Sequence, residues 1–565
     1  MLERPKARAL IISDFNVQNL AGCLNNPGHH PEIDIEVAPF GQVIQILSDF
    51  SHPCWQHPCD YLIVWTLPHR IAGLNKFLDY TRPSVDVLLE NVDRFCRLLH
   101  EAATRVTALF VPLWVIPSYC RGLGMIDLKS EQGIAYALMK ANLRLVENLR
   151  TTSNIYVMNS QRWSEQAGAR NAHNPKLWYM GKIGFGNEVF KEAANDIRAA
   201  ICGLSGQTRK LVIVDLDDTL WGGIVGDIGR ENLRLGGHDP VGESFVDFQL
   251  ALKALKNRGI LLAIVSKNEE SIAMAAISQH PEMILKPGDF AAWRINWIDK
   301  ATNIQDLVKE LNLGLQSVVF IDDNPVERSR VREALPEVYV PEWPEDKLLY
   351  TKALFELTCF DVPGITEEDL ARTELYAAER KREASLTEGT RLEDWLCSLQ
   401  TKVIVEKLNG CNLTRAAQLL NKTNQMNLTT RRMSENDVAE WARQPDHFMW
   451  TFRVSDKFGD AGLTALASIE VAGDTAAVVD FILSCRVIGR KIEQTILHFI
   501  EKQALQLEIR ELQARFIPTE KNNVCHAFWL KESGFTADTA ETLFSLLLQN
   551  PMPLPDGIEL ISNGT

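Results

Sequence analysis

The chain has 565 residues, a hydrophobic content of 46% and a formal net charge of −14. This length is enough for roughly three or four domains with their own cores. The acidic balance argues against nucleic acid or an anionic membrane as the main partner. No apolar run is long enough to cross a membrane, and the first fifteen residues are too charged for a signal peptide.

The eleven cysteines are scattered, odd in number and include no CxxC pair. A secreted disulfide framework or a structural zinc site would need paired spacings of this kind. We therefore expect a cytoplasmic protein that contains neither.

The first segment, residues 1–205, alternates apolar strands with helical stretches. The runs that read as buried strands are ARALIIS, IDIEVAPF, DYLIVWTL and ALFVPLWVI. Strands that alternate with helices predict an α/β domain with a parallel sheet.

Ser13 and Asp14 lie at the end of the first of these strands. This is where α/β hydrolases of the SGNH type hold their nucleophile, and the segment resembles that fold. The GDS motif of such enzymes is absent, and His173 lies in HNPKLWY rather than in a DxxH motif. One interpretation is a hydrolase that uses Ser13 and His173. The interpretation we favour is a non-hydrolytic scaffold for docking or a lid, in which Ser13 and Asp14 cap the next helix.

The second segment, residues 206–350, opens on KLVIVDLDDTLWGG. Its apolar run 211–214 predicts a central strand of a parallel sheet. Asp215 and Asp217 follow two residues apart, so their side chains share a face at the strand end where open α/β sheets bind ligands. Two acids buried together favour a divalent metal, a shared proton or both. Thr219 and the glycines after it turn the chain and leave N–H groups for an anion.

Three later motifs extend this pattern. Ser266 ends the apolar run LLAIVS, Lys300 lies in NWIDK, and Asp322 and Asp323 follow another apolar run in VVFIDDNP. Four motifs in this order resemble the haloacid dehalogenase (HAD) superfamily, whose first motif reads hhhhDxDxT. The spacing leaves room for one amphipathic helix at about 241–258 and for no large cap, so we expect a doubly wound sheet with an open site.

The HAD resemblance implies a role for each motif residue. Asp215 would attack phosphorus, and Asp217 would protonate the leaving oxygen and later activate water. Lys300 would neutralise the charge that builds on the phosphoryl oxygens. The phosphate would be bound by Thr219, Ser266 and Lys300, with Lys267 as an alternative contact. Mg²⁺ would be held by Asp215, Asp217 (through its backbone carbonyl), Asp322 and Asp323.

A narrower resemblance covers residues 206 to 536. DLDDTLWGGIVGDIG, RINWIDKATNI and FIDDNPVER look like the FkbH-like branch of the superfamily (subfamily IIIC). Residues 351–392 match the helical connector of that family, with a charged helix at 366–384. KTNQMNLTTRR, DKFGDAGL, SCRVIGRKIE and PTEKNNVCHAFWLKESGF match its C-terminal half.

Residues 393–565 resemble a GNAT-type acyltransferase domain of the α+β class. ALASIEVAGDTAAVVDFILS predicts a β-hairpin that leads into a central strand, and a helix begins within RVIGRKIEQTILHFIEKQAL. The whole chain is therefore expected to be α/β, with an SGNH-like domain, a HAD-type core without a large cap, and a GNAT-like domain.

Arg486, Gly489 and Arg490 lie in a loop close to the RxxGxG loop that holds a pantetheine pyrophosphate at a helix N-terminus in GNAT domains. Arg490 replaces the second glycine, which favours a carrier-protein phosphopantetheine arm, with its single phosphate, over free coenzyme A. Cys485 is our candidate for an enzyme-bound thioester, because cationic neighbours and the helix N-terminus would favour its thiolate; a small buried apolar residue is the alternative. Some family members carry a cysteine where this chain has Leu216. Weaker candidates are Cys411 and Cys525.

Members of the FkbH-like family remove phosphate from 1,3-bisphosphoglycerate and load the glyceryl unit onto an acyl carrier protein. The resemblance implies a Mg²⁺-dependent glyceryl transferase/phosphatase that serves polyketide-type biosynthesis. A basic patch for the acidic carrier protein would be formed by Arg431, Arg432, Lys457, Arg486, Arg490, Lys491 and Lys521.

Two other functions stay open. One is a HAD phosphatase that acts on a small phosphorylated metabolite and has a vestigial C-terminal half. This interpretation stays open because Leu216 stands where some family members carry a cysteine. The other is a docking scaffold for carrier proteins whose active sites have decayed. The intact acids of the HAD motifs argue against the scaffold.

Overall fold

A computed structural model describes most of the chain in two compact units. The described residues are 7–26, 31–81, 84–237, 239–365, 367–370, 372–373, 375–376, 392–519 and 521–562. The first unit is Met1–Ile201 with Met433–Asp437, and the second is Cys202–Arg432 with Val438–Thr565. The charged helix predicted at 366–384 lies largely outside the described residues. No described helix combines the length and apolar composition that crossing a membrane requires.

The first unit is built on a five-stranded parallel sheet in the order β2-β1-β3-β4-β5. The strands are β1 (Ala7–Ser13), β2 (Ile33–Val37), β3 (Tyr61–Trp65), β4 (Ala108–Pro112) and β5 (Ile155–Met158). The predicted parallel α/β arrangement is confirmed. The sequence did not point to β5, which lies at a sheet edge and is only partly buried.

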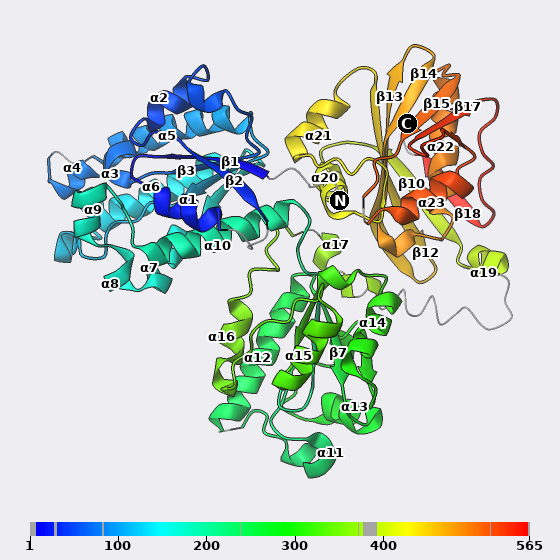
Figure 1. Cartoon of the computed structure of the whole chain (residues 1–565), viewed down its shortest axis with the longest axis horizontal. Helices are drawn as coiled ribbons and strands as arrows, with labels where there is room; N and C mark the ends of the chain where they lie inside the picture. Colours follow the sequence, from blue (N-terminus) through cyan, green and yellow to red (C-terminus); the bar gives the residue numbers. More distant parts are fainter. Residues whose placement is uncertain are drawn as a thin grey trace. The chain divides into compact units, whose positions relative to one another are not determined.

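Helices that lie between these strands or follow the last of them cover the sheet (Figure 1). Two of them, α5 (Val85–Ala103) and α6 (Ile134–Leu149), bury one apolar side each, because their apolar residues recur at helical spacing. The others are α1 (Gln18–Leu24), α2 (Val43–Ser48), α3 (Pro68–Ile71), α4 (Asn75–Leu78), α7 (Ser160–Ala167), α8 (Ala169–Ala172), α9 (Pro175–Gly181) and α10 (Asn187–Leu204).

The second unit contains two sheets, of which the first is parallel with the order β8-β7-β6-β9. Its strands are β6 (Leu211–Val214), β7 (Leu261–Ser266), β8 (Ala292–Ile295) and β9 (Val318–Ile321). The three strands predicted at the HAD motifs are confirmed. The sequence did not point to β8, whose middle residues, a tryptophan and an arginine, are only partly buried.

Alternate residues of β6 pack into different cores, because successive side chains of a strand point to opposite faces. Val212 and Val214 belong to the core with α12 (Pro240–Asn257) and α16 (Tyr350–Phe355). The other two strand residues belong to the core with α14 (Lys300–Glu310) and α15 (Pro325–Ala334). Helices thus cover both faces of the sheet, as a doubly wound fold requires (Figure 1).

The loops after β6 and β7 are short, so the carboxyl end of this sheet has no large cap domain among the described residues. After β6 come α11 (Val225–Ile228) and a short 3-10 helix, and after β7 come α13 (Glu270–Gln279) and another. The predicted helix after the first motif is α12, which begins after the capping residue Asp239. The predicted open site is therefore consistent with the fold.

The second sheet of this unit is mixed, in the order β16-β17-β15-β14-β13-β12-β10-β18, and β11 pairs with β14. β13 (Gly459–Ala472) and β14 (Thr475–Leu483) form the predicted hairpin, and α22 (Ile492–Gln506) begins after the loop that follows it. The other elements are α17 (Glu367–Leu370), α19 (Leu392–Ser398), β10 (Thr401–Lys407), α20 (Leu413–Lys422), β11 (Met426–Asn427), α21 (Glu435–Ala442), β12 (His447–Asp456), β15 (Glu511–Arg515), α23 (Asn523–Lys531), β16 (Thr536–Ala537), β17 (Leu543–Leu547) and β18 (Ile558–Ser562).

The parallel strands β14 and β15 diverge along their length. They pair only over the first four residues of β14, Thr475 to Val478. Further along, Ile482 and Leu483 pair with β11 instead. The wide end of the gap between the two strands is therefore occupied by the chain's own strand.

Candidate active site

The carboxyl ends of β6 and β9 bring three carboxylates together. Asp215 follows β6, and Asp322 and Asp323 follow β9. Oxygen atoms of the three side chains lie within 4.8 Å of one another. Val214 pairs with Ile321 in the register of the two strands, so the residues that follow each strand lie side by side. The convergence of these acids, expected from their strand ends, is thus observed.

Lys300 begins α14 and lies against this group. Its Nζ is 2.6 Å from Oδ2 of Asp322 and 3.1 Å from Oδ1 of Asp215, and only 4% of its side chain is exposed. Burial alone would lower the pKa of Lys300, but the two carboxylates raise it above its ordinary value. The site therefore holds a permanent positive charge between two acids.

Crowding also affects the acids. Burial, followed by the charge of Asp215, raises the pKa of Asp322 well above its usual range. Burial is likewise the main reason why the pKa of Asp323 is raised. Each acid would ionise more readily if a cation lay between them.

Thr219 and Lys347 connect the first and last motifs. The Thr219 hydroxyl accepts a hydrogen bond from the Asp323 backbone N–H at 3.2 Å, and the threonine is fully buried. Lys347 donates to the Asp218 carbonyl at 2.8 Å, and its Nζ lies 3.4 Å from Oδ2 of Asp323. The sequence did not point to Lys347, since it follows Asp323 by 24 residues and belongs to none of the motifs.

The Asp217 carboxylate is held by its own set of donors. They are Trp221 Nε1 at 2.9 Å, the Val225 N–H at 3.0 Å and Asn268 Nδ2 at 2.8 Å. Burial nevertheless raises the pKa of Asp217. The side chain is outside the three-acid group, so metal binding through its backbone carbonyl stays a prediction. Asn268 was missed, although it follows Ser266 by two residues at the same strand end.

Ser266 lies at the carboxyl end of β7 and is 2% exposed. Its hydroxyl forms no hydrogen bond within the described part of the chain and so remains available to a phosphoryl oxygen. The alternative phosphate contact, Lys267, is instead paired with Glu327 at 2.6 Å. The structure therefore favours Ser266 over Lys267 for this role.

The turn after Thr219 depends on a glycine. Gly223 has φ +98°, and a Cβ atom there would lie 2.5 Å from Cδ1 of Ile228. Its N–H donates to the Asp218 carboxylate at 3.2 Å. Both the backbone angle and the lack of space require glycine, which keeps the loop close beside the acids.

The three acids suit a divalent cation. Oδ1 of Asp215 is buried, and its nearest charged neighbour among the described residues is Nζ of Lys300 at 3.1 Å. The three carboxylates lie beside the ammonium groups of Lys300 and Lys347, so one negative charge is left unbalanced when all three acids are ionised. Carboxylate oxygens are the ligands that Mg²⁺ prefers. The residues present therefore fit this metal.

The solved structure of the N-terminal part of BF1531 from Bacteroides fragilis, which contains a phosphatase domain and is complexed with Mg, is 31% identical to this chain. The match covers 64% of this chain and 95% of that one, with a TM-score of 0.59. This chain belongs to the BF1531 family of phosphatase-domain proteins. No protein-family profile matched the chain, and no curated protein did.

Solved N-acetyltransferases also match this member of the BF1531 family. One is the ribosomal-protein-S18-alanine N-acetyltransferase of Escherichia coli, 12% identical over 26% of this chain and 94% of that one, with a TM-score of 0.21. Another is the PaiA N-acetyltransferase of Thermoplasma acidophilum in complex with coenzyme A, 17% identical over 26% and 98%, with a TM-score of 0.19.

In this BF1531-family chain, two acidic side chains bind the loop that was predicted to bind phosphopantetheine. The Gly489 N–H donates to the Glu493 carboxylate at 2.8 Å. Arg490 pairs with Asp456 at 2.5 Å, and both side chains are buried. Arg490 therefore cannot belong to the predicted surface patch for a carrier protein, and that part of the prediction is wrong. A pantetheine contact at Arg486 and Gly489 stays a prediction.

The cysteine candidates differ in what the structure says of them. Cys485 begins a short 3-10 helix, and its side chain lies outside the described part of the structure. Burial raises the pKa of Cys525 to about 12, so this residue is not a thiolate nucleophile. Cys411 is exposed. Leu216 is fully buried in the core on the α12 side of the sheet, where it acts as a packing residue.

The structure does not support a Ser13–His173 catalytic dyad in the first unit. Ser13 accepts a hydrogen bond from the Phe15 N–H at 3.2 Å, and Asp14 accepts from the Leu67 N–H at 3.0 Å. Neither residue caps α1, so the cap that we predicted is wrong. Burial lowers the pKa of His173 to about 4, and its Nδ1 has no hydrogen-bond partner in the part of the chain that the structure describes. Within the described residues, Ser13 and His173 form no hydrogen bond with each other.

Proposed function

We propose that this protein is a Mg²⁺-dependent phosphatase or phosphotransferase of the HAD type. The observation that carries the proposal is the convergence of Asp215, Asp322 and Asp323 around Lys300 at one sheet edge. The Mg-complexed phosphatase domain of the Bacteroides fragilis relative supports it. The HAD motif order assigns the roles of the residues.

The reaction runs through two displacements on phosphorus. A carboxylate oxygen of Asp215 attacks phosphorus, the bond from phosphorus to the leaving oxygen breaks, and Asp217 gives that oxygen its proton. Asp217 then takes a proton from a water molecule that attacks the phosphorus. Phosphate leaves, and the Asp215 carboxylate is regenerated. The raised pKa of Asp217 suits a group that must first hold a proton and then accept one.

In this proposal, two side chains contact the transferring phosphoryl group, and a third positions the loop beside it. Lys300 offsets negative charge on its oxygens, and the hydroxyl of Ser266 donates a hydrogen bond. Thr219 holds the Asp323 loop in place, because its hydroxyl accepts a hydrogen bond from the Asp323 backbone N–H. Mg²⁺, when bound by the three acids, would supply further charge neutralisation at those oxygens.

The surroundings of the acids favour a large acceptor. The loop that follows β8 and the first turn of α15 expose apolar side chains next to the motif residues, namely Trp297 at 76%, Ile298 at 55% and Val326 at 71%. With no cap domain among the described residues to enclose the site, a macromolecule can approach the acids. Exposed apolar side chains beside an active site are typical of a surface that another protein covers.

We propose further that the acceptor is the phosphopantetheine thiol of an acyl carrier protein and that 1,3-bisphosphoglycerate is the donor, as the FkbH-like resemblance implies. The thiol sulfur attacks the acyl carbon, the bond to the acyl phosphate oxygen breaks, and the thiol proton leaves with the phosphate. The HAD site removes the remaining phosphate by hydrolysis. The product is a glyceryl thioester for polyketide-type biosynthesis.

A simpler function is the second candidate. A phosphatase for a small phosphorylated metabolite needs only the HAD site. The Gly489 amide bound by Glu493, the pairing of Arg490 with Asp456, and Leu216 at the position where some relatives carry cysteine all favour this candidate. The two functions differ in whether any thioester forms.

One incubation separates them. The full chain, Mg²⁺, 1,3-bisphosphoglycerate and a phosphopantetheinylated carrier protein are mixed, and the carrier is weighed by intact mass spectrometry. A glyceryl adduct that is lost in Asp215→Asn and kept in Asp306→Asn, an exposed carboxylate on α14, supports the transferase. Phosphate release without an adduct on the carrier supports the plain phosphatase. Cys485→Ala tests whether that thiol carries the acyl group.

A further inference from the structure

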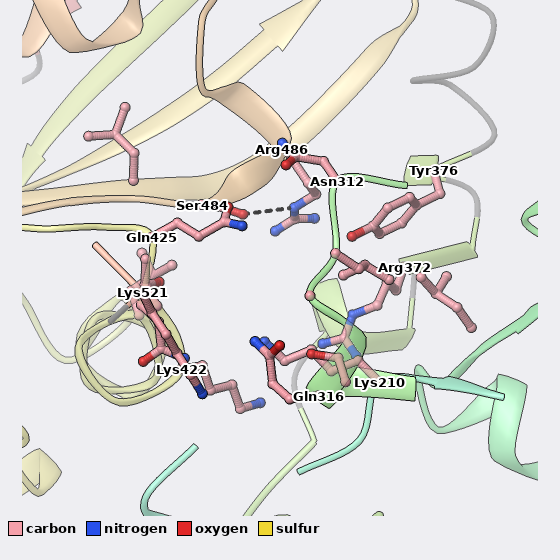
Figure 2. Close-up of a pocket in the computed structure, with 18 of the residues that line it drawn as sticks. Lys210, Asn312, Gln316, Arg372, Tyr376, Lys422, Gln425, Ser484, Arg486 and Lys521 are labelled. Carbon is pink, nitrogen blue, oxygen red and sulfur yellow. Dashed lines mark hydrogen bonds between the residues drawn. The ribbon is translucent and has the colours of Figure 1, made fainter. Parts of the chain in front are cut away.

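A cavity in the second unit lies away from the three acids. It has a volume of about 340 Å³, and residues at the amino ends of β6, β7 and β9 form one wall (Figure 2). Lys210 directly precedes β6, and Asp215 directly follows it. A strand rises about 3.3 Å per residue, so these two residues are roughly 16 Å apart. A ligand in this cavity therefore binds at a site separate from the three acids.

The lining of the cavity is strongly basic. Six of its nineteen lining residues are lysine or arginine, and none of those that the structure describes is aspartate or glutamate. This contrasts with the whole chain, whose net charge is −14. The basic residues come from well-separated parts of the sequence and are Lys210, Arg372, Arg415, Lys422, Arg486 and Lys521.

A buried acid lies beside this group of cations. Asp369 pairs with Arg372 and, at 3.3 Å, with Lys422, from the side of a small adjoining cavity. Burial lowers the pKa of Lys422, and the charges of Arg372 and Arg415 lower it further while Asp369 opposes them. The cations thus repel one another within a partly buried space, and a bound anion would relieve that repulsion.

The other lining residues suit an organic molecule. Side-chain amides, each able to donate and accept hydrogen bonds, are supplied by Asn312, Gln316, Asn424 and Gln425. Tyr376 and leucines from both walls add apolar surface. In Figure 2, Lys210 and Arg372 lie on one side of the open space, and Lys422 and Lys521 lie on the other. Cations on opposite sides favour a ligand with more than one anionic group.

We propose that this cavity binds a small organic molecule that carries two or more phosphate groups, such as a nucleoside diphosphate. Its volume falls within the range of ligand pockets, roughly 300–1,000 Å³. Lysine and arginine are the side chains that most often bind phosphate, and several on facing walls fit a ligand with separated charges. The proposal does not depend on the function of the acids.

Titration calorimetry of the full chain tests it, in Mg²⁺-free buffer with chelator so that the acidic site does not take up phosphate. The probes are pyrophosphate, ADP, orthophosphate and adenosine. We expect saturable binding of pyrophosphate and ADP, affinity for orthophosphate weaker by about tenfold or more, and none for adenosine. Lys210→Gln and Lys521→Gln should each weaken the binding of pyrophosphate by about tenfold.

Matched controls remove the same charge elsewhere. Lys402 and Arg453 form exposed ion pairs and do not line the cavity. Lys402→Gln and Arg453→Gln should bind pyrophosphate as the unchanged chain does. Equal loss in all four variants would mean that only the overall charge matters, and it would overturn the proposal, as would the absence of pyrophosphate binding.

Asp215→Asn separates this proposal from the one about the acids. It should abolish phosphatase activity while pyrophosphate binding in Mg²⁺-free buffer stays unchanged. If Asp215→Asn abolished pyrophosphate binding, the anion would be binding at the acids, and the cavity would have no ligand of this class.

Discussion

Lys300 and Asp322 form an ion pair in which Nζ lies 2.6 Å from Oδ2, and neither side chain is more than 4% exposed. An ion pair this deeply buried is held less by its own attraction than by the charges around it. Asp215, at 3.1 Å from the same Nζ, is the nearest of those charges. The lysine therefore links the residue that would attack phosphorus to an acid that would bind the metal.

Lys300→Met should abolish most of the catalysis. Without the ammonium, Asp215 and Asp322 repel each other, and the phosphoryl oxygens lose a positive charge, so we expect kcat to fall by roughly 10²–10³. In Mg²⁺-free buffer, the unpaired acids should also destabilise the strand ends by about 3–5 kcal/mol. Phosphate release and hydrogen exchange of peptides at β6 and β9 measure the two effects. The control is Lys309→Met, an exposed lysine of the same helix; equal behaviour of the two variants would refute the role of Lys300.

Asn268 acts as a positioning residue for Asp217. Its amide donates to the Asp217 carboxylate at 2.8 Å, which favours the ionised acid. In Asn268→Leu this donor is lost, so the pKa that Asp217 contributes to the pH profile of kcat should rise, and kcat at neutral pH should fall by about tenfold. Asn268→Asp would add a negative charge and shift the profile further. A lower kcat with an unchanged pH profile would mean that Asn268 is only structural.

The sequence located the HAD-type site well because three of its four motifs follow a run of apolar residues. Such runs become buried parallel strands, and the residues after them meet at one edge, which is how Asp215, Ser266 and Asp322 could be placed. Lys347 could not be predicted as a site residue, because it contacts Asp323 from a short 3-10 helix that does not directly follow a strand. Strand β8 was not predicted, because its sequence, AWRI, contains both apolar and charged residues.

Gly223→Ala should destabilise the loop that follows β6. The positive φ and the 2.5 Å approach of a Cβ atom to Ile228 both oppose a side chain. A strained left-handed residue alone costs about 1–2 kcal/mol, and the steric conflict adds to this. Hydrogen exchange of the loop should accelerate and the KM for phosphorylated substrate should rise. Gly288→Ala is the control, because a Cβ atom there meets nothing within 4 Å; if both variants behaved alike, the loop would not need its glycine.

Asp14 should make the first unit less stable as the pH rises. Burial raises the pKa of this acid to about 6 from an ordinary value of 3.8. The folded state therefore holds the proton more tightly than the unfolded state, and stability falls by about 2 kcal/mol between pH 4 and pH 7. Asp14→Asn cannot ionise, so it should be more stable than the unchanged chain at pH 7 and differ little at pH 4. Hydrogen exchange of β1, corrected for intrinsic rates, measures this; a difference that did not change with pH would contradict it.

In the C-terminal half, the secondary structure could be predicted from the sequence, but the contacts between distant residues could not. The hairpin of β13 and β14 and the helix after it followed from alternating apolar residues and a turn at Gly473. The engagement of Gly489 by Glu493 could not be predicted, because it depends on a side chain one helical turn further along bending back to the loop. Nor could the basic cavity, because its six cations are scattered between residues 210 and 521 and converge only in the folded chain.

The most direct measurement is the release of inorganic phosphate from acetyl phosphate by the full chain as Mg²⁺ is titrated. We predict release that requires Mg²⁺, is abolished by Asp215→Asn, is reduced at subsaturating Mg²⁺ by Asp322→Asn, and is unchanged by Asp306→Asn. Phosphate release that persists in Asp215→Asn, or that is as fast with chelator as with Mg²⁺, would contradict the claim that these acids form a metal-dependent phosphoryl site.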